Sequence, residues 1–161
     1  MSRERPTAGI ASAVGFGGNA RGGNRALVAG GGHIGRTVAS HLSDDYDVAF
    51  VSRNRRAVER TERDGIDSRH VEEMDAAALG EIGVENVSVA IVASPDEAVN
   101  FLVAQLLRTR FGVENVVLRV DDCEKMDSFD DLDVEAVCIP DLLVEELAAR
   151  LESFADDVAE P

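Results

Sequence analysis

The chain has 161 residues, of which 45% are apolar, and this length suits one domain with a buried core. Its formal net charge of −15 argues against nucleic-acid binding, because that affinity comes mainly from lysine and arginine, and the absence of tryptophan argues against base stacking. Short apolar runs and a polar amino terminus argue against a membrane span and a signal peptide, so we expect an intracellular protein.

The chain is expected to alternate strands and helices. Residues 1–24 are rich in glycine, alanine and arginine and predict a flexible arm, residues 25–154 form the domain, and residues 155–161 form an acidic tail expected to fray. The expected strands are 25–29, 47–51, 68–71, 87–93, 116–120 and 136–139. The expected helices are 34–42, 54–63, 76–82, 95–111 and one that begins at Asp141. This alternation predicts an α/β, Rossmann-type doubly wound, mostly parallel six-stranded sheet with helices on both faces.

A glycine motif, Gly30-x-Gly32-x-x-Gly35, follows the first expected strand and opens the first helix. In this context Gly30 permits a tight turn, Gly32 lets phosphates approach the backbone, and Gly35 lets helix and strand pack closely. The helix amino terminus adds free N–H groups and a partial positive charge. The motif therefore indicates a nucleotide site, and the alternative is a glycine-rich turn without a ligand.

The end of the second strand, at Ser52 and Arg53, lacks the carboxylate that usually binds the ribose hydroxyls of NAD. An acidic residue there would repel a 2′-phosphate, whereas serine with arginine would accept one through charge-assisted hydrogen bonds. Three arginines stand within residues 53–56, which is unusual in so acidic a chain. In the alternative interpretation they lie on a solvated helical turn and pair with Glu59 or Glu62.

Negative charge is concentrated at the end of the chain, where residues 121–161 hold 15 acidic and two basic residues. Lys125 is the sole lysine, and this composition favours a protein of a high-salt cytoplasm, that is, a halophilic one. Without EF-hand spacing, a solvated acidic face is favoured over a divalent-cation site. The carboxylates concerned are Asp121, Asp122, Glu124, Asp127, Asp130, Asp131, Asp133 and Glu135. Cys123 and Cys138 form no metal-binding motif, so structural zinc and a disulfide framework are not expected.

The final helix carries Leu143, Leu147, Leu151 and Phe154 along one side. The leucines follow i, i+4, i+8 spacing, and a helix at the end of a sheet has only one side to cover. We therefore expect the stripe to pack between subunits in at least a dimer. The alternative is a stripe buried wholly within one subunit.

No residue pair suggests catalysis. His33, His41 and His70 have no partner at a spacing typical of an acid–base pair, and Tyr46 precedes the second strand, away from the strand ends where chemistry occurs. We therefore expect a binding protein rather than an enzyme. The alternatives are an NADP-dependent oxidoreductase and a nucleotide-sensing module of a non-transport protein.

The glycine motif, the strand at 87–94 and the segments 96–100 and 118–122 together resemble the N-terminal nucleotide-binding domain of Trk-type potassium-uptake regulators, the TrkA-N (RCK or KTN) domain. The resemblance covers residues 25–151. It implies a six-stranded Rossmann fold that binds NAD(H) or ATP/ADP and acts through a ring of subunits on a membrane potassium transporter or channel. It also implies a cytoplasmic protein held peripherally at the membrane, a dimer-forming last helix, and a C-terminal regulatory domain that is absent here, so that the chain is a lone subunit or a fragment.

The resemblance also implies where the nucleotide lies. Adenine is placed near the end of the third strand, at Glu72, Glu73 and Met74, and Ala93 and Ser94 end the fourth strand at the switch point of the sheet. Two positions depart from the family pattern, with Ser52 in place of an acidic residue and His33 where arginine is common. The expected nucleotide-binding residues, for NAD(H), NADP(H) or ATP/ADP, are Gly30, Gly32, His33, Ile34, Gly35, Ser52, Arg53, Glu73, Met74, Ala93 and Ser94.

Overall fold

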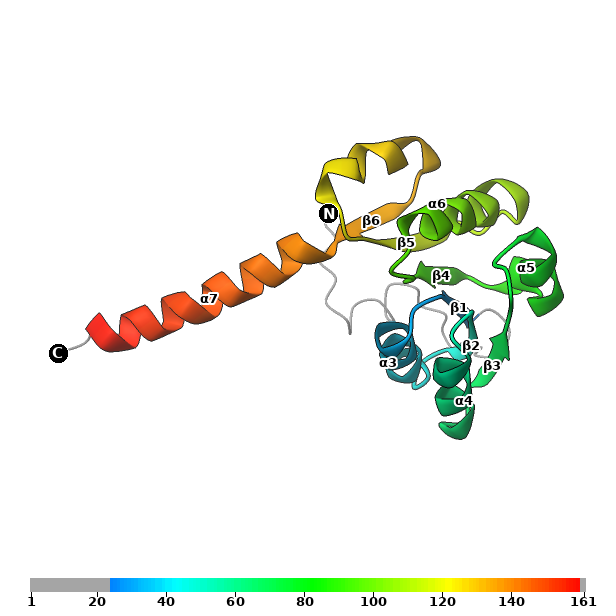
Figure 1. The fold of residues 1–161 in the computed structure, drawn as a ribbon, viewed down its shortest axis with the longest axis horizontal. Helices are drawn as coiled ribbons and strands as arrows, with labels where there is room; N and C mark the ends of the chain where they lie inside the picture. The colour runs from blue at the N-terminus through cyan, green and yellow to red at the C-terminus, as the bar shows by residue number, and fades with distance from the viewer. Residues whose placement is uncertain (1–23, 160–161) are drawn as a thin grey trace.

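The computed structural model describes residues 24–159, which form one parallel sheet of six strands with helices on both faces (Figure 1). The strands are β1 (Arg25–Ala29), β2 (Asp47–Ser52), β3 (Asp67–His70), β4 (Val89–Val92), β5 (Asn115–Val120) and β6 (Glu135–Cys138). The helical elements are α3 (His33–Leu42), α4 (Arg55–Arg63), α5 (Ala76–Ile82), η1 (Val84–Asn86), α6 (Glu97–Gln105), η2 (Leu106–Arg110), η3 (Cys123–Leu132) and α7 (Ile139–Ala159). The strand order β3-β2-β1-β4-β5-β6 confirms the expected Rossmann-type fold.

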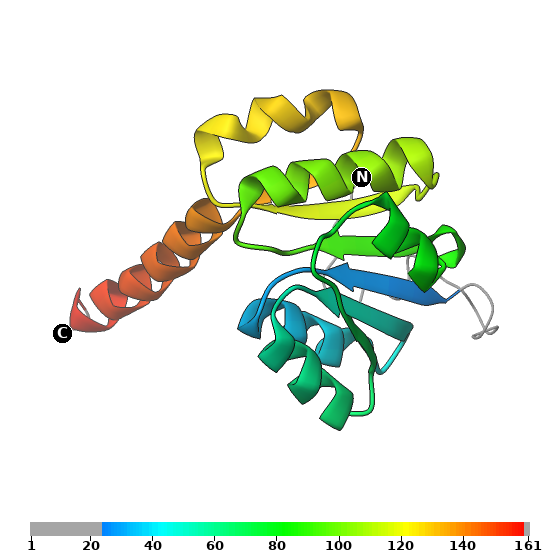
Figure 2. The same cartoon turned by 45° about the vertical axis from the view of Figure 1, so that its right-hand side comes forward.

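The sheet is buried on both faces, as Figure 2 shows, with α3 and α4 on one side and α5 and α6 on the other. Alternate residues of β1 face the two layers: Val28 packs with Phe50 and the first pair of helices, and Leu27 packs with the second pair. Each core is made mainly of aliphatic side chains, with a few aromatic ones, and all are nearly or fully buried. Because both faces are covered, the central strands β1, after Arg25, and β4 are continuous apolar runs rather than alternating ones.

The expected helix ends are confirmed at three points. The side chain of Asn54 caps α4 by accepting a hydrogen bond from Ala57 N–H at 3.0 Å. Gly83 ends α5 and Gly112 follows the π-turn η2, both with the left-handed φ that glycine adopts most easily. The expected arm, apart from Asn24, lies outside the described residues, and α7 continues to Ala159 through most of the stretch expected to fray.

Two helical elements were not predicted, the short η1 and the longer η3. The acidic stretch contains the 3₁₀ helix η3, in which Met126, Phe129 and Leu132 recur every three residues and face the core. A spacing of three matches the three residues per turn of this helix and was the signal that could have revealed it. Two of the carboxylates of the acidic stretch pair with arginine, Asp121 with Arg119 at 3.0 Å and Asp133 with Arg108 at 3.0 Å.

The expectation that the two cysteines stay unpaired was wrong. Cys123 begins η3 and Cys138 ends β6, and the structure joins them in a disulfide with their Cα atoms 5.5 Å apart. Fifteen residues separate the two positions, so no short motif signals the pairing. The fold brings them together because the chain returns through η3 to add β6 beside β5.

Helix α7 extends away from the domain and contacts it through β6 and η3 (Figure 1). Leu143, Leu147, Leu151 and Phe154 are 56%, 54%, 65% and 63% exposed. The interpretation that this stripe is buried within one subunit was therefore wrong. Within residues 24–159, no helix has the length and hydropathy required to cross a membrane.

Candidate functional site

A cavity of about 320 Å³ lies at the carboxyl ends of β1, β2 and β4. It occupies the point where the chain, having built β2 and β3 on one side of β1, continues with β4 on the other. Open α/β sheets bind ligands at this switch point, since the two loops diverge and leave a crevice. The lining residues are Gly30, Gly31, Gly32, Ser52, Arg53, Asn54, Met74, Ser94, Pro95, Asp96 and Val99.

The glycine loop crosses the carboxyl end of β4 so closely that side chains cannot fit. Gly30 and Gly31 both have a φ of +90°, and a Cβ atom on them would lie 2.8 Å from Ser94 Cβ and from the Ala93 carbonyl oxygen, respectively. A Cβ atom on Gly35 would collide with the Gly30 carbonyl oxygen. The structure thus supports the turn and packing roles of Gly30 and Gly35, and it adds Gly31, which the motif spacing does not include.

The amino terminus of α3 faces the cavity without a side-chain cap. Gly32 occupies the N-cap position, makes no capping hydrogen bond, and precedes the exposed residues His33 and Ile34. Uncapped N–H groups at the start of a ten-residue helix attract anions by hydrogen bonding and through the helix dipole. This end of the cavity is therefore suited to phosphate.

Ser52 holds the glycine loop against the end of β2. Its hydroxyl donates a hydrogen bond to the Gly31 carbonyl oxygen at 3.0 Å and accepts one from Asn54 N–H at 3.0 Å, and the residue is 1% exposed. The hydroxyl proton is thus used within the protein. Arg53 and Asn54 are the exposed polar residues that line the cavity beside Ser52. Sequence reasoning identified Asn54 as a helix cap only, and a cap residue carries no signal of ligand contact.

Basic side chains gather beside the same loop. A second cavity, of about 220 Å³, is lined by Gly32, His33, Arg36, Asn54, Arg56, Ala57 and Arg60. Arg36 pairs with Asp64 at 3.3 Å, but no ion pair joins Arg53, Arg55 or Arg56 to Glu59 or Glu62 in the described part of the chain. The pairing proposed in the alternative interpretation is therefore not observed, and a positive surface adjoins the glycine loop in an otherwise acidic protein.

The remaining expected residues divide into those that line the cavity and those that do not. Met74 is buried and lines it beyond β3, whereas Glu73 is exposed and is not a lining residue. Ala93 is buried behind Gly31. The lining is completed by Pro95 and Asp96, in the β4–α6 connection, and by Val99, in the first turn of α6. These three were missed as contacts, although the segment 96–100 contributed to the family resemblance.

The β4 wall of the cavity is held by one buried amide. Asn100 is 1% exposed; it accepts a hydrogen bond from Ser94 N–H at 3.1 Å and donates to the carbonyl oxygens of Ser94 and Arg119 at 2.6 and 3.2 Å. Arg119 in turn donates to the Ala93 carbonyl oxygen at 3.2 Å. Asn100 and Arg119, from the segments 96–100 and 118–122, thus position the end of β4, while Asp96 and Val99 of the first segment line the cavity.

Replacing Asn100 with alanine is expected to lower the free energy of unfolding by about 2–3 kcal/mol, because a buried N–H and two carbonyl groups lose their partner. Asn115→Ala is the matched control, since the Asn115 side chain donates a single exposed hydrogen bond, to the Ser88 carbonyl oxygen. Denaturant melts in high KCl measure both variants. Equal losses in the two would show that the Asn100 network does not hold the wall.

Two side chains weighed as acid–base groups lie away from the cavity. His41 is exposed in the last turn of α3. Tyr46 directly precedes β2, at the amino ends of the strands, whereas the cavity lies at their carboxyl ends. Burial, and to a smaller extent Asp45, raises the pKa of the Tyr46 hydroxyl above its ordinary value. Tyr46 therefore remains a protonated core residue at neutral pH.

The sequence profile of the TrkA-N domain matches residues 26–140. The chain belongs to the TrkA-N family. The Trk system potassium uptake protein TrkA of Mycobacterium tuberculosis is 31% identical over 102 residues, which are 61% of this chain and 45% of that protein. A TrkA homologue from Archaeoglobus fulgidus is 26% identical over 131 residues, which are 79% of this chain and 30% of that protein. The chain thus spans less than half the length of these curated relatives.

Solved structures agree on the fold of this TrkA-N domain. The NAD(P)-binding domain of an exopolyphosphatase-related protein from Archaeoglobus fulgidus superposes with a TM-score of 0.68 at 19% identity, covering 81% of this chain and 98% of that one. The TrkA-N domain of an inner membrane protein from Escherichia coli superposes with a TM-score of 0.71 at 14% identity, covering 80% of this chain and 96% of that one.

Proposed function

We propose that this TrkA-N domain is the regulatory nucleotide-binding subunit of a potassium transport system, sensing NAD(P)(H) or ATP/ADP by binding rather than by catalysis. The observation that carries the proposal is the cavity at the switch point, with an uncapped helix terminus at one end and Arg53, Asn54 and Met74 at the other. Its phosphate end suits a pyrophosphate, and its far end suits an adenosine. The proposed role in potassium uptake is supported by membership of the TrkA-N family and by the names of the curated relatives.

The charge around the cavity favours a ligand with an additional phosphate. The residue at the end of β2 is Ser52 rather than a carboxylate, and Arg53 lines the cavity beside it. Arg36, Arg56 and Arg60 line the adjoining cavity, next to Gly32. An adenosine ribose at the end of β2 would direct a 2′-phosphate toward this basic surface, so within the proposed ligands NADP(H) is favoured over NAD(H).

Calorimetric titration of the chain with NADH, NADPH, ATP and ADP in high KCl tests the proposal. We expect saturable binding of at least one of them at one site per chain, with NADPH binding most tightly. High salt is required because the acidic surface otherwise repels anions at long range. If none of the four produced binding heat, nucleotide sensing would be excluded.

We also propose that α7 joins two copies of the chain. Its leucine stripe is more than half exposed, and one ion pair, Arg150 with Glu146 at 2.6 Å, flanks it. We expect light scattering in high salt to report a dimer or higher oligomer at micromolar concentration. Leu147→Glu should shift it toward monomer, because the carboxylate would be buried unpaired. Ala149→Glu, on the opposite side of the helix, should leave the mass unchanged. A monomeric unmodified chain would contradict the proposal.

We propose a cytoplasmic location at the inner face of the membrane, reached through a potassium transporter or channel subunit. The support is the family and the transport systems named for the relatives. Exposed side chains on α7 and the β4–α6 side of the cavity are the surfaces through which nucleotide occupancy would reach a partner.

A further inference from the structure

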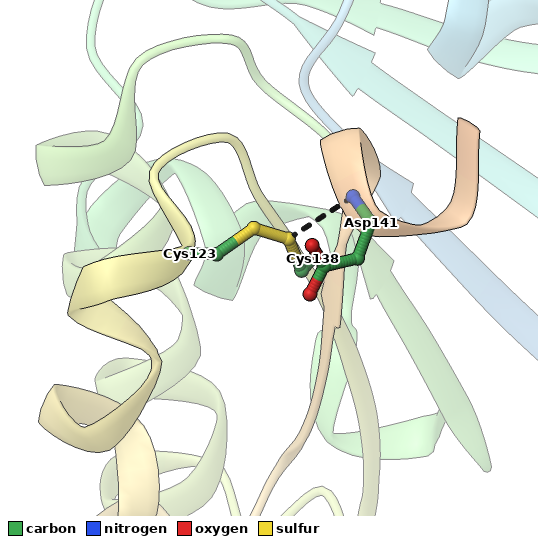
Figure 3. A group of neighbouring side chains, drawn as sticks. All are labelled: Cys123, Cys138 and Asp141. Atoms are coloured by element: carbon green, nitrogen blue, oxygen red, sulfur yellow. Dashed lines mark hydrogen bonds between the residues drawn. A yellow bond between two sulfur atoms is a disulfide. The ribbon is translucent and has the colours of Figure 1, made fainter. Parts of the chain in front are cut away.

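The junction between η3 and α7 contains a cluster of reactive side chains outside the nucleotide cavity. Cys123 opens η3, Cys138 ends β6, and Asp141 lies in the first turn of α7 (Figure 3). One ligand atom from each of the three residues lies within 4.8 Å of the others, and the two sulfur atoms are bonded. We propose that Cys123–Cys138 is a thiol–disulfide exchange site that small thiols open at Cys123, and that it fastens the base of α7 to η3.

The two sulfur atoms differ in access. Cys123 is partly exposed at the start of η3, whereas Cys138 is 7% exposed beneath the first turn of α7. An attacking thiolate therefore reaches the Sγ atom of Cys123. Attack at this sulfur leaves Cys138 as the departing group, and exchange rates depend both on which sulfur is attacked and on how well the other departs.

Helix α7 is arranged to receive the departing sulfur. Cys138 directly precedes the helix, and its Sγ atom accepts a hydrogen bond from Asp141 N–H at 3.4 Å, as a side chain does at an N-cap (Figure 3). The amino terminus of a 21-residue helix also favours negative charge on that sulfur. The Asp141 carboxylate opposes it, so removing this carboxylate should speed opening.

The exchange balances in two steps. A small thiolate attacks the Cys123 sulfur, the bond between the cysteines breaks, and Cys138 leaves as a thiolate that takes a proton from water. A second thiol attacks the small-molecule sulfur of the mixed disulfide, releasing Cys123 as a thiol and a small-molecule disulfide. The protein gains two electrons and two protons, and two small thiols are oxidised. Oxidised small-molecule disulfide closes the bond by the reverse path.

The bond lies where α7 meets the domain. Helix α7 contacts β6 and η3. The disulfide links these two elements covalently, because Cys123 begins η3 and Cys138 ends β6. The other end of η3 is held by Arg108, which donates to the Leu132 carbonyl oxygen and to Asp133. Opening the bond leaves the start of η3 attached through Glu97, which accepts hydrogen bonds from Asp121 and Asp122 N–H. Reduction should therefore loosen η3 and free the orientation of α7.

This site goes beyond nucleotide sensing. In reducing compartments disulfides are commonly transient and redox-sensing. A redox-sensing role for this disulfide rests on the proposed cytoplasmic location. The exchange chemistry and its effect on the structure do not depend on that location.

The test is a redox titration of the full chain in mixtures of reduced and oxidised glutathione at high KCl. Maleimide trapping and intact mass count the free thiols. We expect one cooperative transition between zero and two alkylated cysteines. In Cys138→Ser, oxidised glutathione should modify Cys123, and in Cys123→Ser it should modify Cys138 about 10-fold more slowly, because that sulfur is buried.

Hydrogen exchange supplies a readout independent of nucleotide. In the reduced chain the backbone amides of residues 123–132 should exchange faster, by a factor of at most about 100, as expected when a loop of this size is released. The double variant Cys123→Ser/Cys138→Ser should exchange like the reduced chain and ignore the redox buffer. Thiols that stay reduced throughout, equal reactivity of the two cysteines, or unchanged exchange in η3 would each overturn the proposal.

Asp141→Asn separates exchange from metal binding, because it keeps the N–H donor and removes a carboxylate ligand. If the cluster is an exchange site, this variant keeps the redox transition between disulfide and two thiols, and its disulfide is reduced faster. If instead the reduced chain held zinc through two thiolates and Asp141, and lost it in Asp141→Asn, the cluster would be a metal site and the proposal would be wrong.

Discussion

Gly32→Asp is expected to reduce nucleotide affinity by about 100-fold or more while leaving the fold intact. The new carboxylate would stand at the N-cap of α3, where the proposed phosphates meet the helix, and would replace favourable contacts of roughly 1.5–3 kcal/mol each with repulsion. Gly32 has a φ of −105°, and its Cβ would lie 3.0 Å from the side-chain nitrogen of Asn54, which must shift slightly while its oxygen caps α4. Aspartate caps helices from extended backbone, whereas Gly32 has a ψ of −101°, so we expect no gain from capping and a melting temperature close to that of the unmodified chain.

Gly32→Asn is the matched control, because it adds the same bulk without charge. Calorimetry should show a smaller loss for asparagine than for aspartate if phosphate lies at this helix end. Thermal melts of both variants check that the fold persists. Unchanged affinity in Gly32→Asp would remove the glycine loop from the site, and equal losses in the two variants would attribute the effect to bulk alone.

Arg53→Ala is expected to abolish a roughly 10- to 100-fold preference for NADPH over NADH. One charge-assisted hydrogen bond to a 2′-phosphate contributes about 1.5–3 kcal/mol, before high salt weakens it. Arg53 is exposed and lines the cavity, so its removal should not disturb the fold. Arg55→Ala is the control, since Arg55 is equally exposed and lines neither cavity.

Ser52→Asp should move the preference toward NADH, because a carboxylate at the end of β2 binds ribose hydroxyls and repels a 2′-phosphate. The structure adds a cost: the aspartate loses the hydrogen bond from Ser52 to the Gly31 carbonyl oxygen and places charge against it. The ratio of NADH to NADPH affinity is therefore the measurement, rather than either affinity alone. Equal affinity of the unmodified chain for both would contradict the 2′-phosphate proposal and leave adenine-nucleotide binding standing.

The central fold could be predicted from the sequence because its signals are local. The apolar run of β1, the glycine motif and the Asn54 cap each lie within a few residues, and each acts through backbone geometry at that place. The six strands and their parallel pairing followed from this alternation, whereas the order β3-β2-β1-β4-β5-β6 came from the structure. The spacing of Met126, Phe129 and Leu132 was also local, but a short 3₁₀ pattern within an acidic stretch resembles a solvated loop.

By itself, the sequence determined the Rossmann-type architecture, the glycine loop and the apolar stripe of α7, because periodicity and steric freedom are properties of neighbouring residues. Only the tertiary structure decided that the Ser52 hydroxyl bonds Gly31, that Asn54 lines the cavity, and that Cys123 meets Cys138. It also decided that the stripe of α7 stays exposed. These features depend on which distant segments the sheet order brings together, and a residue's type and spacing do not encode the partner that the fold places beside it.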